Sequence, residues 1–82
     1  MATIEEALTR AAHRRTVLPP PRVRRSIREA AGLSQGELAD VLGVHRISVS
    51  RYESGQREPR GKLRLAYSEA LRAMSPGPEV SA

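Results

Sequence analysis

Apolar residues recur at helical spacing between positions 34 and 55, and a glycine divides them into two groups. The apolar positions lie on both sides of Gly43 and are Leu38, Ala39, Leu42, Val44, Val49 and Tyr52. This spacing predicts two short amphipathic helices, each with one apolar face and one polar face. The two apolar faces should pack on each other.

Capping residues mark the ends of these two helices. Ser34 followed by Glu37 has the S-x-x-E form of a capping box, so the first helix should begin at Ser34. Gly43 and Gly55 suit the left-handed backbone that closes a helix. We therefore expect the second helix between these two glycines.

Residues 3–15 predict an additional helix near the N-terminus. Ile4, Leu8 and Ala11 or Ala12 lie three or four positions apart, and acidic residues precede basic ones, which suits the helix dipole. The apolar stripe is narrow, so this helix should need a neighbour to be stable. The three prolines at positions 19–21 should then form a stiff, extended linker.

Two more helices should flank the central pair. The first should run from Pro21 or Arg22 to Ala31 and stop at Gly32. Its inward residues are expected to be Val23, Ile27 and Ala30 or Ala31, and its outward residues Arg22, Arg24 and Arg25.

The second flanking helix should span residues 60–74, after a polar loop that contains Pro59. Its apolar stripe comprises Leu63, Leu65, Ala66, Ala70, Leu71 and Met74. Residues 75–82 contain turn-forming residues, so a disordered tail is expected there. The predicted organisation is a helix and linker over 1–21, an all-α domain over 22–74 and the tail.

The central segment resembles the Cro/lambda-repressor-like (Xre-type) helix-turn-helix family. That family's pattern runs LSQ-x-ELA-x-x-LGV, a short polar stretch, and VSR-aromatic-E-x-G-x-R-x-P. This sequence matches it without a gap from Leu33 to Pro59, and the resemblance covers residues 22 to about 74. It implies a compact bundle of four to five helices that binds DNA.

The resemblance also implies a structural ion pair between Arg28 and Glu53. The family's domain usually has a fifth helix after the one expected at 60–74, and this sequence ends before that helix could form. We hypothesise that the N-terminal helix takes over part of its role. It would either cover the same apolar surface or pair with a second subunit.

The second helix of the central pair is the candidate for insertion into the major groove, with its first residues against base edges. The candidate base-contacting residues are His45, Arg46, Ile47, Ser50 and Arg51. The two arginines could each bind guanine through two hydrogen bonds, and Ile47 could contact a thymine methyl or be half-buried packing. His45 stands where the family often has serine or threonine. An imidazole there could give binding a mild pH dependence, although a neutral surface histidine is the simpler interpretation.

A second group of residues is expected to contact the phosphate backbone and fix register without selecting sequence. These residues are Gln35, Ser54, Gln56, Arg57 and Arg60. Gln35 lies at the first turn of its helix, where backbone amides attract phosphate, and it could alternatively cap that helix.

Composition narrows the remaining possibilities. The 82 residues allow one domain, and 14 Lys and Arg against 9 Asp and Glu give a net charge of +5, which favours a polyanionic partner. There is no cysteine, no apolar run near the ~18 residues of a membrane span, and no signal-peptide core. His13 and His45 have no ligand or nucleophile spacing, so neither an enzyme nor a metal or cofactor site is expected.

We therefore expect a cytoplasmic, sequence-specific transcriptional regulator of bacterial or phage type, acting as a repressor. It should bind double-stranded DNA as a homodimer, because one helix contacts few base pairs and genomic specificity needs two half-sites about 34 Å apart. An alternative is an antitoxin-like module that binds a toxin or another regulator and autoregulates its operon through the same helices. A third class is a purely architectural domain.

Overall fold

The structure is a computed structural model that describes residues 3–75, apart from the side chains of residues 12–15. All regular structure within this range is α-helical. The helices are α1 (Ile4–Arg15), α2 (Pro21–Ala30), α3 (Gln35–Leu42), α4 (Arg46–Ser54) and α5 (Gly61–Met74). The predicted all-α class is confirmed, and the expected tail over 76–82 lies outside the described residues.

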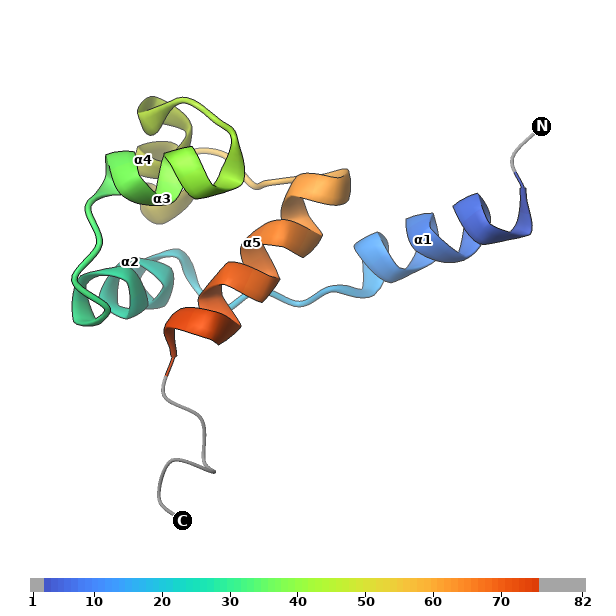
Figure 1. The fold of residues 1–82 in the computed structure, drawn as a ribbon, viewed down its shortest axis with the longest axis horizontal. Coiled ribbons are helices and arrows are strands. Elements are labelled where there is room, and N and C mark those ends of the chain that lie inside the picture. Colours follow the sequence, from blue (N-terminus) through green and yellow to red (C-terminus); the bar gives the residue numbers. More distant parts are fainter. Residues whose placement is uncertain (1–2, 76–82) are drawn as a thin grey trace, which may run out of the picture.

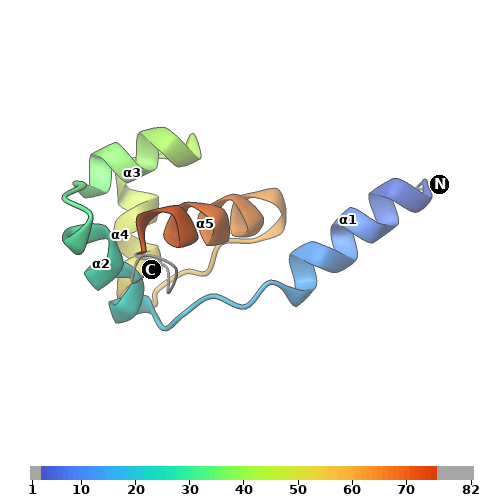
Figure 2. The ribbon, with the colours of Figure 1, turned by 60° about the horizontal axis from the view of Figure 1, so that its bottom comes forward.

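Helices α2 to α5 form one body, and α1 stands to one side of it at the end of an extended segment (Figures 1 and 2). Helix α3 packs most closely on α4, α2 packs on both α4 and α5, and α1 approaches the body at α5. The loop after α4 leads directly into α5 (Figure 1). None of the described helices is long and apolar enough to cross a bilayer.

The core is small and is formed by residues of the linker, α3, α4 and α5. Its buried apolar residues are Leu18, Leu38, Ala39, Val49, Tyr52, Tyr67 and Leu71. The rings of Tyr52 and Tyr67 are tilted by 54° with centroids 5.7 Å apart, a favourable aromatic geometry. Val49 and Tyr67 are fully buried, so both α4 and α5 contribute side chains to this core.

The predicted ends of α3 and α4 agree with the structure. Ser34 caps α3, since its Oγ accepts the Glu37 N–H at 3.0 Å and Glu37 Oε1 accepts the Ser34 N–H at 2.8 Å. Gly43 closes α3 with φ +70°, and Gly55 closes α4 with φ +80°. These are left-handed conformations that side chains with a Cβ rarely adopt.

The prediction for α2 was wrong at Arg24, which points inward and is 3% exposed. Its Nε donates to the Pro19 carbonyl at 2.7 Å, and its two terminal nitrogens donate to Glu58 at 3.1 and 2.8 Å. Val23, predicted inward, is 38% exposed. A buried guanidinium is stable here because carbonyl and carboxylate acceptors surround it.

The predicted inward positions at the end of α2 were also wrong. Ala30 and Ala31 are both exposed, and the helix ends at Ala30, one residue earlier than expected. Ile27 does pack against the core as predicted.

The linker between α1 and α2 is fixed to the body. Leu18 is buried in the core, and Arg64 Nε of α5 donates to the Thr16 carbonyl at 2.8 Å, while Arg24 holds the Pro19 carbonyl. The linker is therefore a packed segment, and it sets the direction in which α1 leaves the domain.

Helix α1 does not cover an apolar surface of its own domain. Ile4 is 81% exposed and Leu8 is 67% exposed. The first form of the hypothesis for this helix is therefore wrong, because α1 contacts α5 but leaves Ile4 and Leu8 exposed to solvent (Figure 2). Pairing of α1 with a second subunit stays a prediction.

Candidate nucleic-acid interface

Helix α4 has two chemically different faces. Val49, Tyr52 and Glu53 are buried against the domain, whereas the side chains of Arg46 and Arg51 are exposed. Among the other predicted base-contacting residues, His45 is exposed, Ile47 is 45% exposed and Ser50 is partly buried. Helical spacing produces this division, because residues 49, 52 and 53 are three or four positions apart.

The first turn of α4 lies beside the first turn of α3. A Cβ atom added to Gly36 would lie 3.8 Å from Arg46 Cδ, so the aliphatic stem of Arg46 runs along the start of α3. The Arg46 side chain therefore shares one surface with the N-terminus of α3, whose unpaired amides favour anions.

His45 is the residue that caps α4. Its backbone is extended (φ −77°, ψ 146°), and its Nδ1 accepts the Ile47 N–H at 3.2 Å. The imidazole thus caps the helix in place of the serine or threonine side chain that usually occupies an N-cap position.

The predicted phosphate-contacting residues after α4 lie around one open hollow. Gln56, Arg57 and Arg60 line it and are exposed, while Ser54 is exposed nearby with its Oγ donating to the Arg51 carbonyl at 3.2 Å. Glu58 also lines the hollow, but the buried Arg24 engages its carboxylate. The acidic residue in this loop is therefore neutralised from within, which leaves the outer surface basic.

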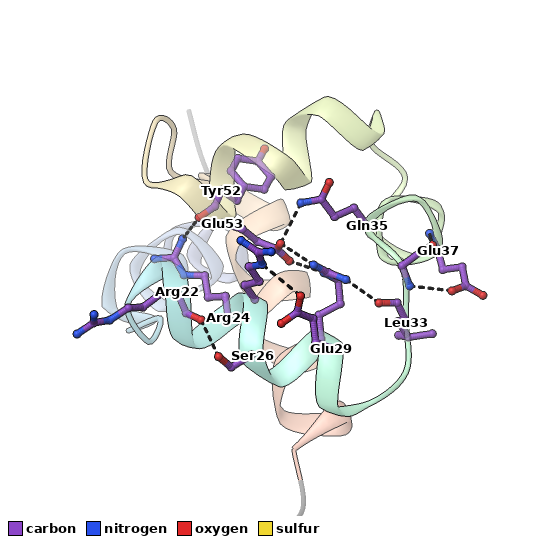
Figure 3. A network of polar contacts seen from close by, with 12 residues as sticks. Arg22, Arg24, Ser26, Glu29, Leu33, Gln35, Glu37, Tyr52 and Glu53 are labelled. Atoms are coloured by element: carbon purple, nitrogen blue, oxygen red, sulfur yellow. Dashed lines mark hydrogen bonds and ion pairs between the residues drawn. The ribbon is translucent and has the colours of Figure 1, made fainter.

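Gln35 is half-buried and turned toward the interior. Its Nε2 donates to Glu53 Oε1 at 3.0 Å (Figure 3). The alternative that Gln35 caps α3 is wrong, since Ser34 has that role and Gln35 is the first helical residue.

A buried ion pair holds the inner face of α4. Arg28 Nε and Nη2 donate to the two carboxylate oxygens of Glu53 at 2.6 and 3.0 Å, and Nη1 donates to the Leu33 carbonyl at 2.7 Å. The side chains are 8% and 2% exposed. The hydrogen bonds to Glu53 raise the pKa of Arg28 above its ordinary value. This network joins α2, the start of α3 and α4 at one point (Figure 3).

Sequence reasoning missed three features that shape this surface, namely the buried Leu18, the buried Tyr67 and the Arg24–Glu58 pair. For Arg24 a signal was present. It lies four residues before Arg28 and so shares a helical face with a residue already expected to be buried. For Leu18 no signal was present, because Val17 and Leu18 form one apolar pair ahead of the prolines at 19–21, and such a pair has no periodicity.

Helices α3 and α4 pack on each other across a short turn at Gly43, which is the arrangement of a helix-turn-helix, and α4 carries the exposed Arg46 and Arg51. The profile of the helix-turn-helix family matches residues 25–77, more than half of the chain. The chain therefore belongs to the helix-turn-helix family.

A curated relative shares 61% identity over 31 residues, which is 38% of this chain and 10% of the relative. It comes from Methanocella arvoryzae and is named as a candidate HTH-type transcriptional regulatory protein. The matched segment is thus about a tenth of that longer protein. No solved structure matches the chain significantly.

Proposed function

We propose that this chain is a sequence-specific DNA-binding transcriptional regulator that inserts α4 into the major groove. The observation that carries the proposal is that Arg46 and Arg51 of α4 are exposed while the ion pair of Glu53 with Arg28 fixes the helix to the domain. A helix with its side chains is about 10–12 Å wide, which matches the ~12 Å major groove. The name of the Methanocella relative supports the same class of function.

Within this proposal the basic residues have two roles. Arg46 and Arg51 extend from α4 and would donate to base edges, where each bidentate arginine–guanine pair gives about 1–3 kcal/mol of discrimination. Arg57 and Arg60 follow α4 on the loop and would bind phosphates, which fixes register but selects no sequence. Gln35 would contribute through its backbone at the start of α3, because its side chain amide is engaged by Glu53.

The regulator would act as a repressor in the cytoplasm and bind its operator as a homodimer. A single α4 spans only a few base pairs, so two half-sites about 34 Å apart are needed for specificity. The exposed Ile4 and Leu8 of α1 offer an apolar surface for a second subunit. The same exposure favours the alternative function, an antitoxin-like chain whose α1 binds a protein encoded beside it.

The test begins with selection of bound duplexes from a random pool, which yields the operator and its symmetry. Arg46→Ala should then lose roughly 1–3 kcal/mol of affinity and relax base preference at one operator position. Arg57→Ala should weaken specific and random duplexes alike and flatten the salt slope by about one unit. Fluorescence anisotropy titrations at several salt concentrations measure both effects.

Arg72→Ala is the matched control, because it removes the same charge from an exposed position in the last turn of α5. It should leave affinity and salt slope close to those of the parent. If Arg46→Ala and Arg57→Ala lose affinity equally on specific and random duplexes, the proposed division of roles is wrong. A tight complex with a neighbouring gene product that is required for operator binding would favour the antitoxin-like function.

A further inference from the structure

His45 combines two features that are seldom found in one side chain. It caps the candidate recognition helix through Nδ1, which accepts the Ile47 N–H at 3.2 Å, and it is exposed beside Arg46. Serine and threonine, two of the usual capping residues, cap through a hydroxyl on Cβ, which reaches less far from the backbone than the Nε2 of an imidazole. A ring also presents a second nitrogen, on the edge that does not face the helix.

The capping bond determines which nitrogen of the ring carries the proton. A neutral imidazole has one N–H and one nitrogen with a free lone pair. The backbone N–H of Ile47 can only donate, so Nδ1 must be the lone-pair nitrogen. The proton of the neutral ring is therefore on Nε2, and the helix start selects this tautomer before any DNA is present.

From this geometry we infer that His45 is a hydrogen-bond donor of fixed polarity toward DNA, an inference that rests on the proposed function. The Nε2–H would bind an acceptor at the edge of the major groove, either a purine N7 or a phosphate oxygen. It cannot accept from the amino groups of adenine or cytosine, because the only acceptor of the ring is already engaged by Ile47. His45 thus adds a donor-only contact to those of Arg46.

The tautomer can be tested without DNA. Long-range proton–nitrogen NMR correlations of the free protein distinguish a protonated nitrogen from one with a lone pair. We expect His45 to show the lone pair on Nδ1 and the proton on Nε2. A ring with its proton on Nδ1 would overturn the inference whatever the protein does with DNA.

The contact is tested with two substitutions at the same position. His45→Ser keeps an oxygen that can cap α4 but removes the Nε2 donor, and His45→Ala removes both. We expect His45→Ser to keep the thermal midpoint of the parent and to bind the selected operator about fivefold more weakly, the effect of one net hydrogen bond. His45→Ala should lower the thermal midpoint as well.

The acceptor is located by altering the operator one atom at a time. Replacing one purine with its 7-deaza analogue should weaken the parent about fivefold and leave His45→Ser unaffected if N7 is the acceptor. A methylphosphonate at one position should do the same if a phosphate oxygen is the acceptor. Equal binding of His45→Ser and the parent, or no altered position that affects the parent alone, would overturn the inference. A parent that selects no duplex would refute the proposed function and the DNA contact together, while the tautomer measured in the free protein would stand.

Discussion

Replacing Arg28 with alanine removes the cation that neutralises Glu53 behind α4. The carboxylate of Glu53 is 2% exposed and loses two hydrogen bonds, so that Gln35 Nε2, at 3.0 Å, is the side-chain donor left to it among the described residues. The Leu33 carbonyl loses its guanidinium donor as well. The substitution therefore creates both an unpaired buried charge and an unpaired carbonyl.

The expected loss is large relative to the stability of so small a domain. Removing one partner of a buried ion pair costs about 3–5 kcal/mol, because the remaining charge has no solvent and no counterion. Below about 80 residues a single core rarely supplies more than about 3–5 kcal/mol of net stability. Arg28→Ala should therefore be largely unfolded, and its loss of DNA binding would follow from the loss of the fold.

Urea titration followed by circular dichroism measures this effect, and Arg25→Ala is its matched control. Arg25 lies on the same helix and pairs with Glu29 at 3.2 Å, but the two side chains are 62% and 54% exposed. Its replacement should change the free energy of unfolding by less than about 0.5 kcal/mol. The double variant Arg28→Met with Glu53→Leu should recover much of the loss, since it leaves no buried charge.

Two outcomes would refute the reasoning. A free energy of unfolding for Arg28→Ala within about 1 kcal/mol of the parent would show that Glu53 is not stranded by the substitution. If the double variant were as unstable as Arg28→Ala, the loss would come from side-chain packing rather than from the unpaired carboxylate.

Four further substitutions test the core and the cap of α3. Tyr67 is fully buried and its hydroxyl has no hydrogen-bond partner among the described residues, so Tyr67→Phe should hold or raise the unfolding free energy, by up to about 1 kcal/mol in urea titrations. Burial raises the pKa of Tyr67 to about 12. The free energy of unfolding that comes from keeping this phenol neutral is therefore complete below about pH 10 and is lost as the pH rises toward 12. Alkaline titrations of Tyr67→Phe should lack this loss. Ser34→Ala should cost about 1 kcal/mol as the cap of α3 is lost. The hydrogen bond from the backbone N–H of Ser34 lowers the pKa of Glu37. The contribution of the Glu37 carboxylate to stability is therefore present above the ordinary pKa of glutamate and is lost as the pH falls through the lowered value. The unfolding of Glu37→Gln should depend less on acid pH than that of the parent. Leu18→Ala should cost about 2–4 kcal/mol, and a smaller cost would show that the linker is not part of the core.

The agreement between prediction and structure is best where the determining interactions are local. The capping box at Ser34 and the left-handed glycines at positions 43 and 55 act within four or five residues, so their sequence pattern is enough to place the ends of α3 and α4. The exposed face of α4 also followed from spacing alone. These features delimit the helix that the proposed function uses.

Disagreement is concentrated where the partner is distant in sequence. Arg24 was assigned to solvent because a guanidinium is usually exposed, yet Glu58 lies 34 residues away and pairs with it under the loop after α4. Leu18 is part of the core because hydrogen bonds fix the backbone on both sides of it. Arg64 donates to the carbonyl of Thr16, and Arg24 donates to the carbonyl of Pro19.

The sequence by itself determined where the helices of the central pair begin and end and that Arg46 and Arg51 of α4 are exposed. Tertiary structure alone decided that Leu18 of the linker is part of the core, that Ile4 and Leu8 of α1 stay exposed, and that Arg24 is buried. The physical reason is the range of the interactions involved. Caps and helical periodicity depend on neighbours a few residues away, whereas the burial of a charge depends on acceptors that only the folded chain brings together.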